Sequence, residues 1–395
     1  MTMAAAIESR RAEAPAWSKA SRIAHIDVVT DLAAAEPIWR ALEGGTGTFT
    51  PYQRFDFLAA WQRQVGERRD ISPFIVIGFD AERRPLFLLP LAIWHRRGVR
   101  VAAFMGDKHT TFNMGLWDKA FASEANAADL ATLLSSLSQR ADIDMLDLRQ
   151  QPARWHDLKN PFALIRHQPS VNSCPALTIV PGAGPAQISD SLRRRLKGKE
   201  RKLEKLPGYR YRLARTDEEI VRLLDWFFHT KPLRMAEQRL PNVFGEPGVE
   251  DFLREACSAR LPGGSRAIDI HALECDDEVI ALFAGVADGE RFSMMFNTYT
   301  MSAHSRYSPG LILIRNIIDY YVAQGFRALD LGIGSDDYKR FFCKGDEPIF
   351  DCFVPLSGRG KLVCVAMSML NRIKRLVKQN QALLGLAQRL RGALH

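Results

Sequence analysis

The sequence SRYSPGLILIRNIIDYY, residues 305–321, joins a tight turn to an apolar helix without a break. Ser308 is a favourable N-cap residue, and Pro309 fits the first helical position because it has no amide proton to leave unsatisfied. Apolar residues then recur at helical spacing, and Gly325 predicts where the helix ends. The start of this helix is therefore sharply specified.

This helix start has the features of an anion-binding site. We expect the amides of Gly310, Leu311 and Ile312 to point outward at the positive end of the helix dipole, which suits a phosphate group. Arg306 adds a potential charge-assisted contact. The alternative interpretation is that Ser-Pro-Gly is only an efficient way to begin a helix.

The elements around the helix repeat an order that also occurs earlier in the chain. In each half, a meander of three strand-like runs is followed by a loop, a helix and one more strand. We therefore expect an α/β (α+β) protein built from two units of one design, each a mixed central sheet flanked by helices. The expected division is a flexible N-terminal tail over 1–22, a first unit over 23–170, a second unit over 171–358 and a basic amphipathic helix over 359–395.

The composition is that of an ordinary globular protein with an excess of positive charge. The 395 residues are 47% hydrophobic and 25% charged, which predicts two domains and argues against disorder or a fibrous repeat. The formal net charge of +9 favours an anionic ligand, nucleic acid or a membrane surface as partner. Composition alone does not choose among these partners.

The location and the metal content can also be predicted. The six cysteines are scattered without metal-ligand spacing, so we expect reduced, buried thiols and no metal. The N-terminus lacks the continuous apolar core of a secretory signal, and no apolar run approaches the ~20 residues that cross a bilayer. We therefore expect a cytoplasmic protein.

The order of strands, SPG turn, helix, LDLGIG strand and DDYKRFF segment (336–342) resembles the GNAT acyltransferase fold. It is most similar to the tandem-GNAT branch that includes CelD-type cellulose-biosynthesis acetyltransferases and, more distantly, FemABX aminoacyl transferases. The resemblance covers about residues 23–356 and is strongest over 270–343. One departure concerns the phosphate loop, Q/R-x-x-G-x-G/A in the family, which is R-Y-S-P-G here and offers fewer amide donors.

The resemblance implies an acyl-CoA site in the second unit. The pantetheine arm would lie between splayed central strands, near Phe296 and Tyr299, and the pyrophosphate would rest on residues 308–311. The residues that the resemblance assigns to the coenzyme are Phe296, Tyr299, Arg306, Ser308, Gly310, Leu311 and Ile312.

The resemblance also implies the catalytic groups. Tyr338 would protonate the leaving thiolate, Asp337 with Asp336 would accept a proton or attract an amine, and Lys339 and Lys344 would hold the acceptor or a developing oxyanion. The alternatives are an aromatic ring packed under the sheet, capping carboxylates and solvated lysines.

The first unit has no coenzyme-type turn in its corresponding loop, GDKHTTFN (106–113). We therefore expect this half to bind no coenzyme. His109, Thr110 and Asn113 are instead predicted to face the cleft between the units and to contact the acceptor. The alternative for His109 is a surface histidine.

Two basic segments remain. The run from Arg193 to Lys202 contains seven basic residues and suits coenzyme phosphates, tRNA or a lipid-linked sugar, or else forms a solvated helix with its leucines inward. No aromatic residue lies between Leu192 and Leu206, which disfavours RNA recognition. Residues 359–395 contain no acidic residue and suit docking on the protein body, a partner or an anionic membrane at the inner face.

The sequence thus predicts an acyltransferase that moves an acetyl or similar group from acyl-CoA to an amine or hydroxyl of a small or saccharide-linked acceptor, in cellulose, exopolysaccharide or cell-envelope synthesis. One alternative is FemABX-like transfer from aminoacyl-tRNA, the single reading that involves a nucleic acid. Another is a non-catalytic scaffold of a polysaccharide synthesis complex.

Overall fold

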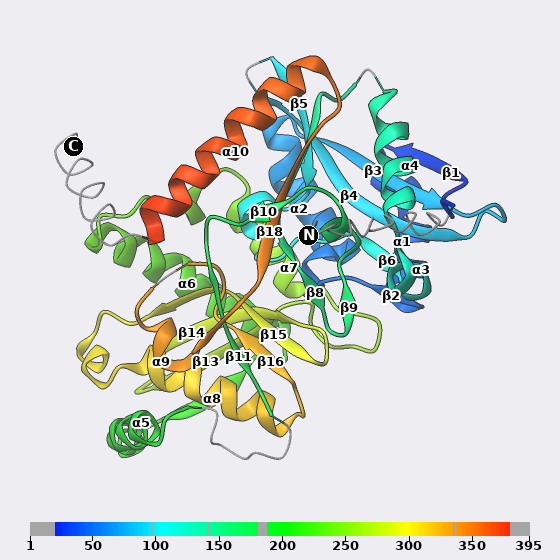
Figure 1. The fold of residues 1–395 in the computed structure, drawn as a ribbon. Coiled ribbons are helices and arrows are strands. Elements are labelled where there is room, and N and C mark those ends of the chain that lie inside the picture. Colours follow the sequence, from blue (N-terminus) through cyan, green and yellow to red (C-terminus); the bar gives the residue numbers. More distant parts are fainter. Residues whose placement is uncertain (1–19, 97, 141, 181–187, 335, 380–395) are drawn as a thin grey trace, which may run out of the picture.

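The structure is a computed structural model that describes residues 20–96, 98–140, 142–180, 188–334 and 336–379 (Figure 1). Most of the predicted tail, residues 1–19, and the last part of the predicted C-terminal helix, residues 380–395, lie outside the described residues. Near the start of the described chain, the backbone amide of Arg22 donates to the carboxylate of Asp129 in α4 (Ala127–Ser138), at 2.8 Å. Arg22 is therefore already part of the first unit.

The first sheet is mixed and mostly antiparallel. It carries the strands β1 (His25–Val29), β3 (Ser72–Phe79), β4 (Pro85–Arg96), β5 (Val99–Phe104), β7 (Met145–Pro152), β18 (Ile349–Pro355) and β10 (Gln168–Pro169) in that order, with β2 (Gly47–Thr48) and β6 (Leu116–Asp118) attached at β4. Its parallel pair is β5 with β7, over three residue pairs from Val101 opposite Met145 to Ala103 opposite Asp147.

The second sheet repeats this plan below the first (Figure 1). Its order is β12 (Arg210–Leu213), β13 (Asp269–Cys275), β14 (Glu278–Ala287), β15 (Arg291–Tyr299), β16 (Ala328–Asp330), β11 (Cys174–Thr178) and β17 (Gly345–Glu347). Here the meander again ends on a parallel pair of three residues, β15 with β16. The predicted fold class, two units each with a mixed sheet and flanking helices, is confirmed.

One boundary differs from the expectation. Residues 349–355 were expected in the second unit, but β18 pairs antiparallel with β7 in the first sheet, from Ile349 opposite Pro152 to Pro355 opposite Met145. The chain therefore returns from the second sheet to complete the first. Long-range strand pairing of this kind leaves no signal in local sequence patterns.

Helices cover both sheets, and several carry side-chain caps at their N-termini, such as the capping box of Thr216 and Glu219. The helices are α1 (Leu32–Gly44), α2 (Phe55–Trp61), α3 (Lys119–Glu124), α4 (Ala127–Ser138), α5 (Asp190–Leu203), α6 (Asp217–Glu237), α7 (Val249–Ser258), α8 (Pro309–Ala323), α9 (Lys339–Phe342) and α10 (Gly358–Gln379). Shorter turns are η1 (Pro51–Gln53), the π-helical η2 (Gln62–Gly66), η3 (Glu67–Arg69), η4 (Asp107–His109), η5 (Pro161–Leu164), η6 (Val243–Gly245) and η7 (Ala303–Tyr307), and a small hairpin joins β8 (Arg154–Trp155) to β9 (Leu158–Lys159).

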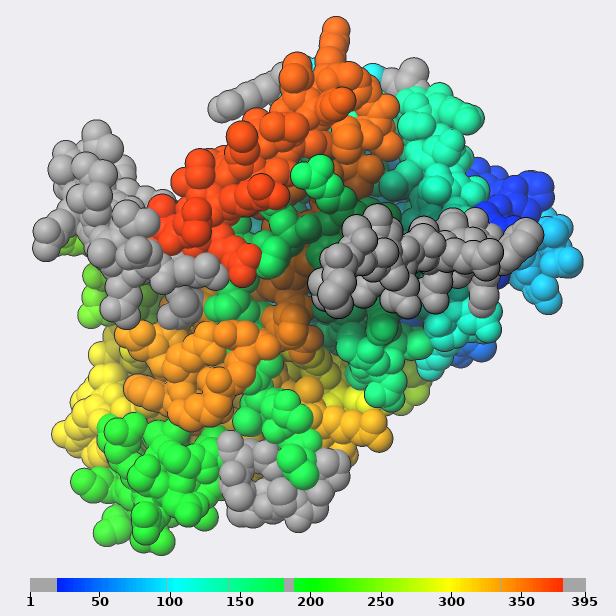
Figure 2. All heavy atoms as spheres, in the orientation of Figure 1, coloured from blue at the N-terminus to red at the C-terminus, as the bar shows by residue number. Residues whose placement is uncertain are grey.

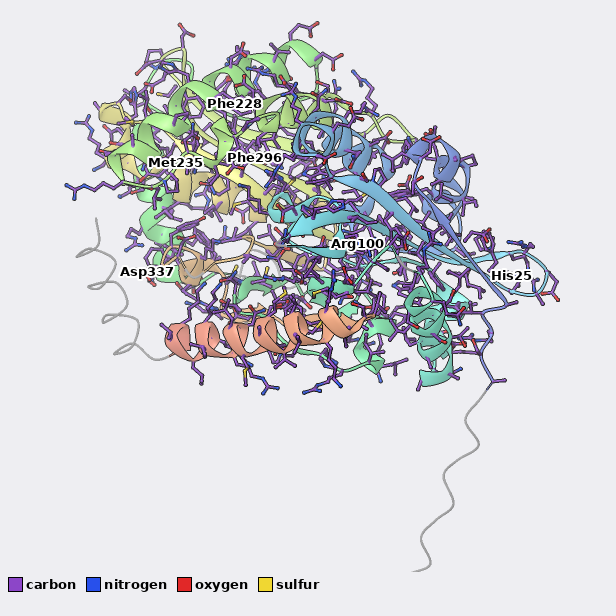
Figure 3. The ribbon with its side chains drawn as sticks, turned by 90° about the horizontal axis from the view of Figure 1, so that it is seen from above. His25, Arg100, Phe228, Met235, Phe296 and Asp337 are labelled. Carbon is purple, nitrogen blue, oxygen red and sulfur yellow. The ribbon has the colours of Figure 1, made fainter. Side chains whose placement is uncertain are left out.

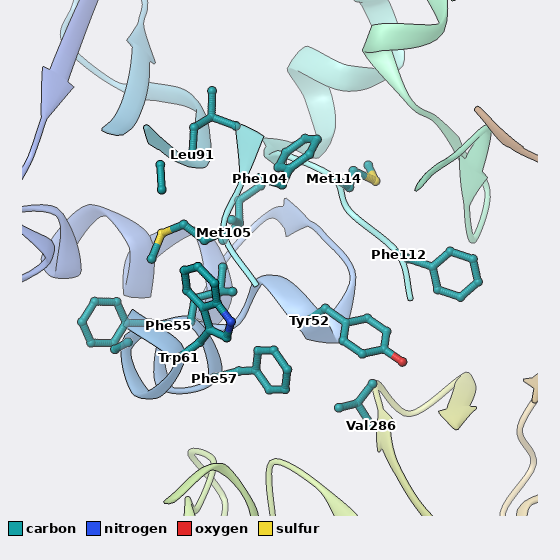
Figure 4. Close-up of a cluster of buried hydrophobic side chains, with 14 of the residues drawn as sticks. Tyr52, Phe55, Phe57, Trp61, Leu91, Phe104, Met105, Phe112, Met114 and Val286 are labelled. Atoms are coloured by element: carbon teal, nitrogen blue, oxygen red, sulfur yellow. The ribbon is translucent and has the colours of Figure 1, made fainter. Parts of the chain in front are cut away.

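One hydrophobic core cluster spans the two units, and a second cluster lies within the second unit. Val286 of the second sheet approaches the aromatic cluster of Tyr52 and Phe57 in the first unit (Figure 4). Phe57 also meets Phe252 of α7 edge to face, with ring centroids 5.2 Å apart. Arg54 adds a hydrogen bond across the junction, from Nη2 to the carbonyl of Ala287 (2.7 Å). The units are therefore packed as one body.

Two further findings bear on location and chemistry. All six cysteines are buried and free, as expected. Among the described residues, no helix has the combination of length and hydropathy that crosses a bilayer.

Candidate functional site

The central feature of the second unit is a divergence between two parallel strands. β15 pairs with β16 only from Arg291 to Ser293, whereas on its other side it pairs with β14 as far as Tyr299. Among the described residues, no strand pairs with residues 294–299 on the β16 side. A β-bulge at Met295 adds local twist to this free half of β15.

Buried polar contacts fix the point where the strands part. The carboxylate of Asp330, at the end of β16, accepts from Arg291 Nε (3.0 Å) and from Ser293 Oγ (2.6 Å). Its other oxygen accepts from the amide of Gly332 (3.1 Å). Gly332 has φ +73°, and an added Cβ would lie 3.0 Å from the carbonyl oxygen of Met294. Glycine therefore lets the chain turn away directly beside β15.

The first sheet has the same divergence, between β5 and β7. There, however, the edge of β7 beyond the divergence is occupied by the loop of Asn113. Asn113, predicted to contact the acceptor, donates from Nδ2 to the carbonyl of Arg149 (3.2 Å), and its backbone amide donates to Gln150 (3.0 Å). Its Oδ1 accepts from Thr110 Oγ1 (2.9 Å). The side chain of Asn113 is buried and bonded through both Oδ1 and Nδ2, so it ties its loop to β7, and it lines a different cavity from His109.

His109 lies at the junction of the two units. It lines a cavity of about 140 Å³ together with Phe244 of η6, Leu253 of α7 and the bulge residue Met295. The cavity therefore touches the free half of β15. Figure 3 shows Phe296, which also lines it, in the interior of the molecule.

The imidazole of His109 is poised as a donor. Its Nδ1 accepts from the indole Nε1 of Trp61 (3.1 Å), which leaves the proton of the neutral ring on Nε2. Nε2 is buried without a hydrogen-bond partner. Burial lowers the pKa of His109 to about 4, so the ring is neutral near pH 7. It can donate a hydrogen bond to an acceptor molecule, whereas its lone pair is already engaged.

Tyr338 stands beside the divergence. Burial, followed by the charge of Asp336, raises the pKa of Tyr338 above its usual range, and the side chain of Asn297 on the free half of β15 opposes this rise. The ring packs against the core under α8. A protonated phenol is thus held next to the free edge.

The neighbouring predicted residues have different surroundings. Lys339 is buried, and its Nζ donates to the carbonyls of Gly332 (3.2 Å) and Ile333 (2.9 Å) and pairs with Asp336 (3.3 Å). These contacts use its donors, so Lys339 holds the loop after β16 and has none left for an oxyanion.

The two remaining groups of this segment are exposed. Asp337 is open to solvent at the start of α9 (Figure 3). Lys344 is also exposed, and its Nζ donates to the carbonyl of Arg340 (3.0 Å). Neither is brought to His109 by an observed contact.

The start of α8 corrects the expectation of three free amides. Ser308 adopts a left-handed conformation (φ 58°, ψ 53°), and its side chain makes no capping bond. Its carbonyl accepts from the amides of Leu311 (3.0 Å) and Ile312 (3.2 Å), as the first acceptor of a helix does. Gly310 retains the one first-turn amide without an observed partner.

A lysine of the basic run adds charge at this place. Lys199 of α5 donates from Nζ to Ser308 Oγ (2.7 Å). Arg306 is exposed beside it and donates to Tyr307 (2.8 Å). The sequence marked the run as basic but did not single out Lys199, because its position depends on the packing of α5 on α8.

Not every residue of the basic run is available for a ligand. Arg193 is buried and forms a bidentate pair with Asp319 of α8 (2.8 and 3.0 Å). Glu200 accepts from Arg315 (2.5 Å) and Asn316 (3.1 Å). These contacts lock α5 onto α8, while Arg194, Arg195 and Lys197 remain exposed.

Sequence reasoning also missed two cations of α6. The guanidinium of Arg234 lies 3.5 Å from the ring centroid of Tyr299, at the end of β15. Lys231 lies over the ring of Phe244, and burial lowers its pKa. Both follow from how α6 packs on β15.

One group among the described residues has the spacing of a metal site: Cys275, Asp276 and His304. His304 already pairs with Asp276 (3.2 Å) and Glu278 (3.1 Å). Burial raises the pKa of Cys275 to about 11, which keeps a protonated thiol and not a thiolate ligand. The group is accounted for by the hydrogen bonds of His304 beside a core cysteine.

Comparison with known proteins identifies the segment that contains the divergence. Residues 190–340 match the acetyltransferase (GNAT) domain. The matched segment runs from α5 through β15, α8 and β16 and ends in α9, just beyond Tyr338. No curated protein sequence gives a significant match to the chain.

Two solved structures share the fold over both units. The C-terminal DUF2156 domain of a proposed lysylphosphatidylglycerol synthetase from Agrobacterium fabrum is 11% identical, with a TM-score of 0.51 over 86% of this chain and 96% of that one. A conserved protein of unknown function from Bacteroides thetaiotaomicron is 9% identical, with a TM-score of 0.52 over 84% of this chain and 100% of that one. At these identities the likeness concerns the fold alone.

Proposed function

We propose that the protein is a GNAT-type acyltransferase that moves an acetyl or other acyl group from acyl-CoA to an amine or hydroxyl. The observation that carries this proposal is the free edge of β15 inside the GNAT domain. Unpaired backbone groups at residues 294–299 can bond the amides of a pantetheine arm. The edge then points the thioester toward Tyr338 and the cavity of His109.

In this proposal the phosphates bind at the start of α8. The amide of Gly310 and the cations of Lys199 and Arg306 lie there, and the dipole of α8 favours negative charge. Phe296 and Tyr299 flank the pantetheine arm. Leu311 and Ile312 support the turn through their bonds to Ser308.

The chemistry needs few groups once the reactants are aligned. The acceptor nitrogen or oxygen attacks the thioester carbonyl carbon, the carbon–sulfur bond breaks, and Tyr338 gives its proton to the leaving sulfur. The proton of the nucleophile passes to water or to Asp337. His109 donates a hydrogen bond that orients the acceptor, Lys339 positions the loop, and Lys344 attracts an anionic part of the acceptor.

Calorimetric titration with acetyl-CoA tests the proposal. Wild-type protein should bind saturably, and Gly310→Glu should abolish binding because it places a negative charge at the phosphate site. A Cβ added at Gly310 would meet Tyr299 at an ordinary 3.5 Å, so the backbone there accepts a side chain. Gly44→Glu, in open space at the end of α1, is the matched control. Absence of heat with acetyl-CoA and with longer acyl-CoAs would refute the proposal.

The exposed cations of α5 favour one alternative, transfer of an amino acid from aminoacyl-tRNA. That reading predicts tRNA binding with a steep salt dependence. A scaffold without catalysis predicts that Tyr338→Phe leaves biological activity intact while removal of residues 359–395 abolishes it. The acetyl-CoA titration separates both from the leading proposal.

We further propose a small or saccharide-linked acceptor, a role in cellulose, exopolysaccharide or cell-envelope synthesis, and a cytoplasmic location. The support for this biological setting is the sequence resemblance to CelD-type enzymes. Assay of the purified protein with acetyl-CoA against amino sugars and against lipid-linked saccharides tests the acceptor class.

A further inference from the structure

α10 has two faces of different character, and one of them anchors it to the first sheet. Cys364 packs against Met145 of β7, and Asn371 donates to the carboxylate of Asp351 in β18 (3.1 Å). This face accounts for the predicted docking on the protein body. Seen from above, α10 forms one edge of the molecule (Figure 3).

The opposite face is apolar and open to solvent. Five residues at positions i, i+3, i+7, i+11 and i+14 fall on one helical stripe. With one neighbour they make up what we call the α10 stripe: Leu362, Val365, Met369, Leu370, Ile373 and Leu376. Their exposed fractions run from 49% to 76%, although soluble monomers seldom expose contiguous apolar patches of this extent. Figure 2 shows α10 lying on the outside of the molecule.

The charges of α10 indicate what covers the stripe. Residues 358–379 contain six basic side chains and no acidic one. Arg359, Lys361, Arg372 and Lys374 are exposed, and Lys361 and Arg372 border the stripe on one side. An apolar stripe flanked by cations matches a surface that is apolar within and anionic at its boundary.

A cavity opens beside the stripe. It has a volume of about 500 Å³ between α10, β18 and the segment before β10. Val365 and Met369 of the stripe form part of its wall with Ile165 and Phe353, and the cations Arg166, Lys361 and Arg372 stand at its border. The apolar surface of α10 therefore continues into the protein and is not limited to the helix.

We infer that the α10 stripe seats on the surface of a bilayer that contains anionic lipid, with α10 parallel to the membrane plane. The apolar side chains enter the boundary between head groups and acyl chains, and the flanking cations contact lipid phosphates. This goes beyond acyl transfer and does not depend on it.

Cosedimentation of the full-length protein with vesicles tests the inference. The protein should bind vesicles of phosphatidylcholine with phosphatidylglycerol and bind those of phosphatidylcholine alone much more weakly. Ile373→Glu with Leu376→Glu should weaken binding at least about tenfold, since two charges enter the interface. Arg372→Ala with Lys374→Ala should cost about fivefold per charge. Val221→Glu with Leu240→Glu, at residues of similar exposure elsewhere, is the matched control and should bind as wild type.

Three outcomes would overturn the inference. The first is that wild-type protein stays in the supernatant with both kinds of vesicle. The second is that the Ile373→Glu, Leu376→Glu variant binds vesicles as strongly as wild type. The third is a smaller particle for this variant in sedimentation velocity with lipid binding unaltered, because the stripe would then join two copies of the chain. Unchanged circular dichroism and melting temperature establish that each variant is folded.

Discussion

At the scale of single residues, the hydroxyl of Tyr338 is the sharpest test of the proposed chemistry. Burial raises the pKa of Tyr338 and keeps a proton beside the free edge of β15. Tyr338→Phe removes that proton and leaves the packing of the ring unchanged. We expect the rate of CoA release from acetyl-CoA to fall by about 10²–10⁴-fold, while the Kd for acetyl-CoA changes little. Tyr320→Phe, which removes a hydroxyl bonded to Arg215, is the control and should retain activity.

A second residue-scale prediction concerns acid stability. His271 is fully buried, with Nδ1 bonded to Tyr211 (2.8 Å) and Nε2 to Tyr321 (3.1 Å), and burial lowers the pKa of His271 to about 3. Its unfolded pKa is about 6.5, so below that pH the unfolded chain binds one more proton. The contribution of His271 to the free energy of unfolding should be constant above about pH 6.5. Below about pH 6.5 it should lower the free energy of unfolding by up to about 1.4 kcal/mol per pH unit, down to about pH 3.

Urea unfolding between pH 4 and pH 8 measures this dependence. His271→Gln keeps polar groups near both tyrosines but does not titrate. It should be less stable than wild type at pH 8 and lose less stability on acidification. Parallel pH profiles for the two proteins would contradict the assignment of this loss to His271. Burial also lowers the pKa of His109 to about 4, so His109 adds a further loss of stability on acidification in both wild type and the His271→Gln variant.

At the scale of elements, the turn after β16 sets the opening of the site. Gly332→Ala places a Cβ 3.0 Å from the carbonyl of Met294 at φ +73°, whereas Gly98→Ala has φ +76° with nothing within 4 Å. The left-handed conformation should cost both variants about 1–2 kcal/mol. Gly332→Ala should lose about 1–3 kcal/mol more through overpacking and should bind acetyl-CoA more weakly. Thermal unfolding measures the loss of stability, and calorimetry measures the affinity for acetyl-CoA. If the two variants are equally stable, β15 shifts to make room for the added Cβ without cost.

The same scale shows what the sequence predicts well. The start of α8 and the meanders of both sheets follow from local patterns of proline, glycine and apolar residues, and they lie where expected. The place of β18 in the first sheet and of Lys199 beside Ser308 depends on contacts between distant segments, which periodicity does not record. Lys339 was expected to hold a ligand because the resemblance to FemABX-like enzymes implies a basic residue there, and the carbonyls that accept from its Nζ became evident only in the folded loop.

At the scale of the whole molecule, the shared core predicts that the units unfold together. Phe252 of α7 is buried against Phe57 of the first unit and also meets the ring of His109. Phe252→Ala should cost about 3–5 kcal/mol, because it opens a cavity between the units. Tryptophan fluorescence mainly reports unfolding of the first unit, because Trp226 is the single tryptophan of the second unit and the others belong to earlier segments.

The fluorescence transition of Phe252→Ala, although the change lies in the second unit, should therefore move to lower temperature as one step. Its midpoint should agree with that from far-ultraviolet circular dichroism, which averages over both sheets. Val221→Ala, at an exposed position of α6, should shift neither transition. If the fluorescence midpoint stays at the wild-type temperature while circular dichroism shows an earlier step, the units unfold independently. The cavity at His109 would then form only when two separately stable halves meet, whereas a single transition means that the cavity is as stable as the fold itself.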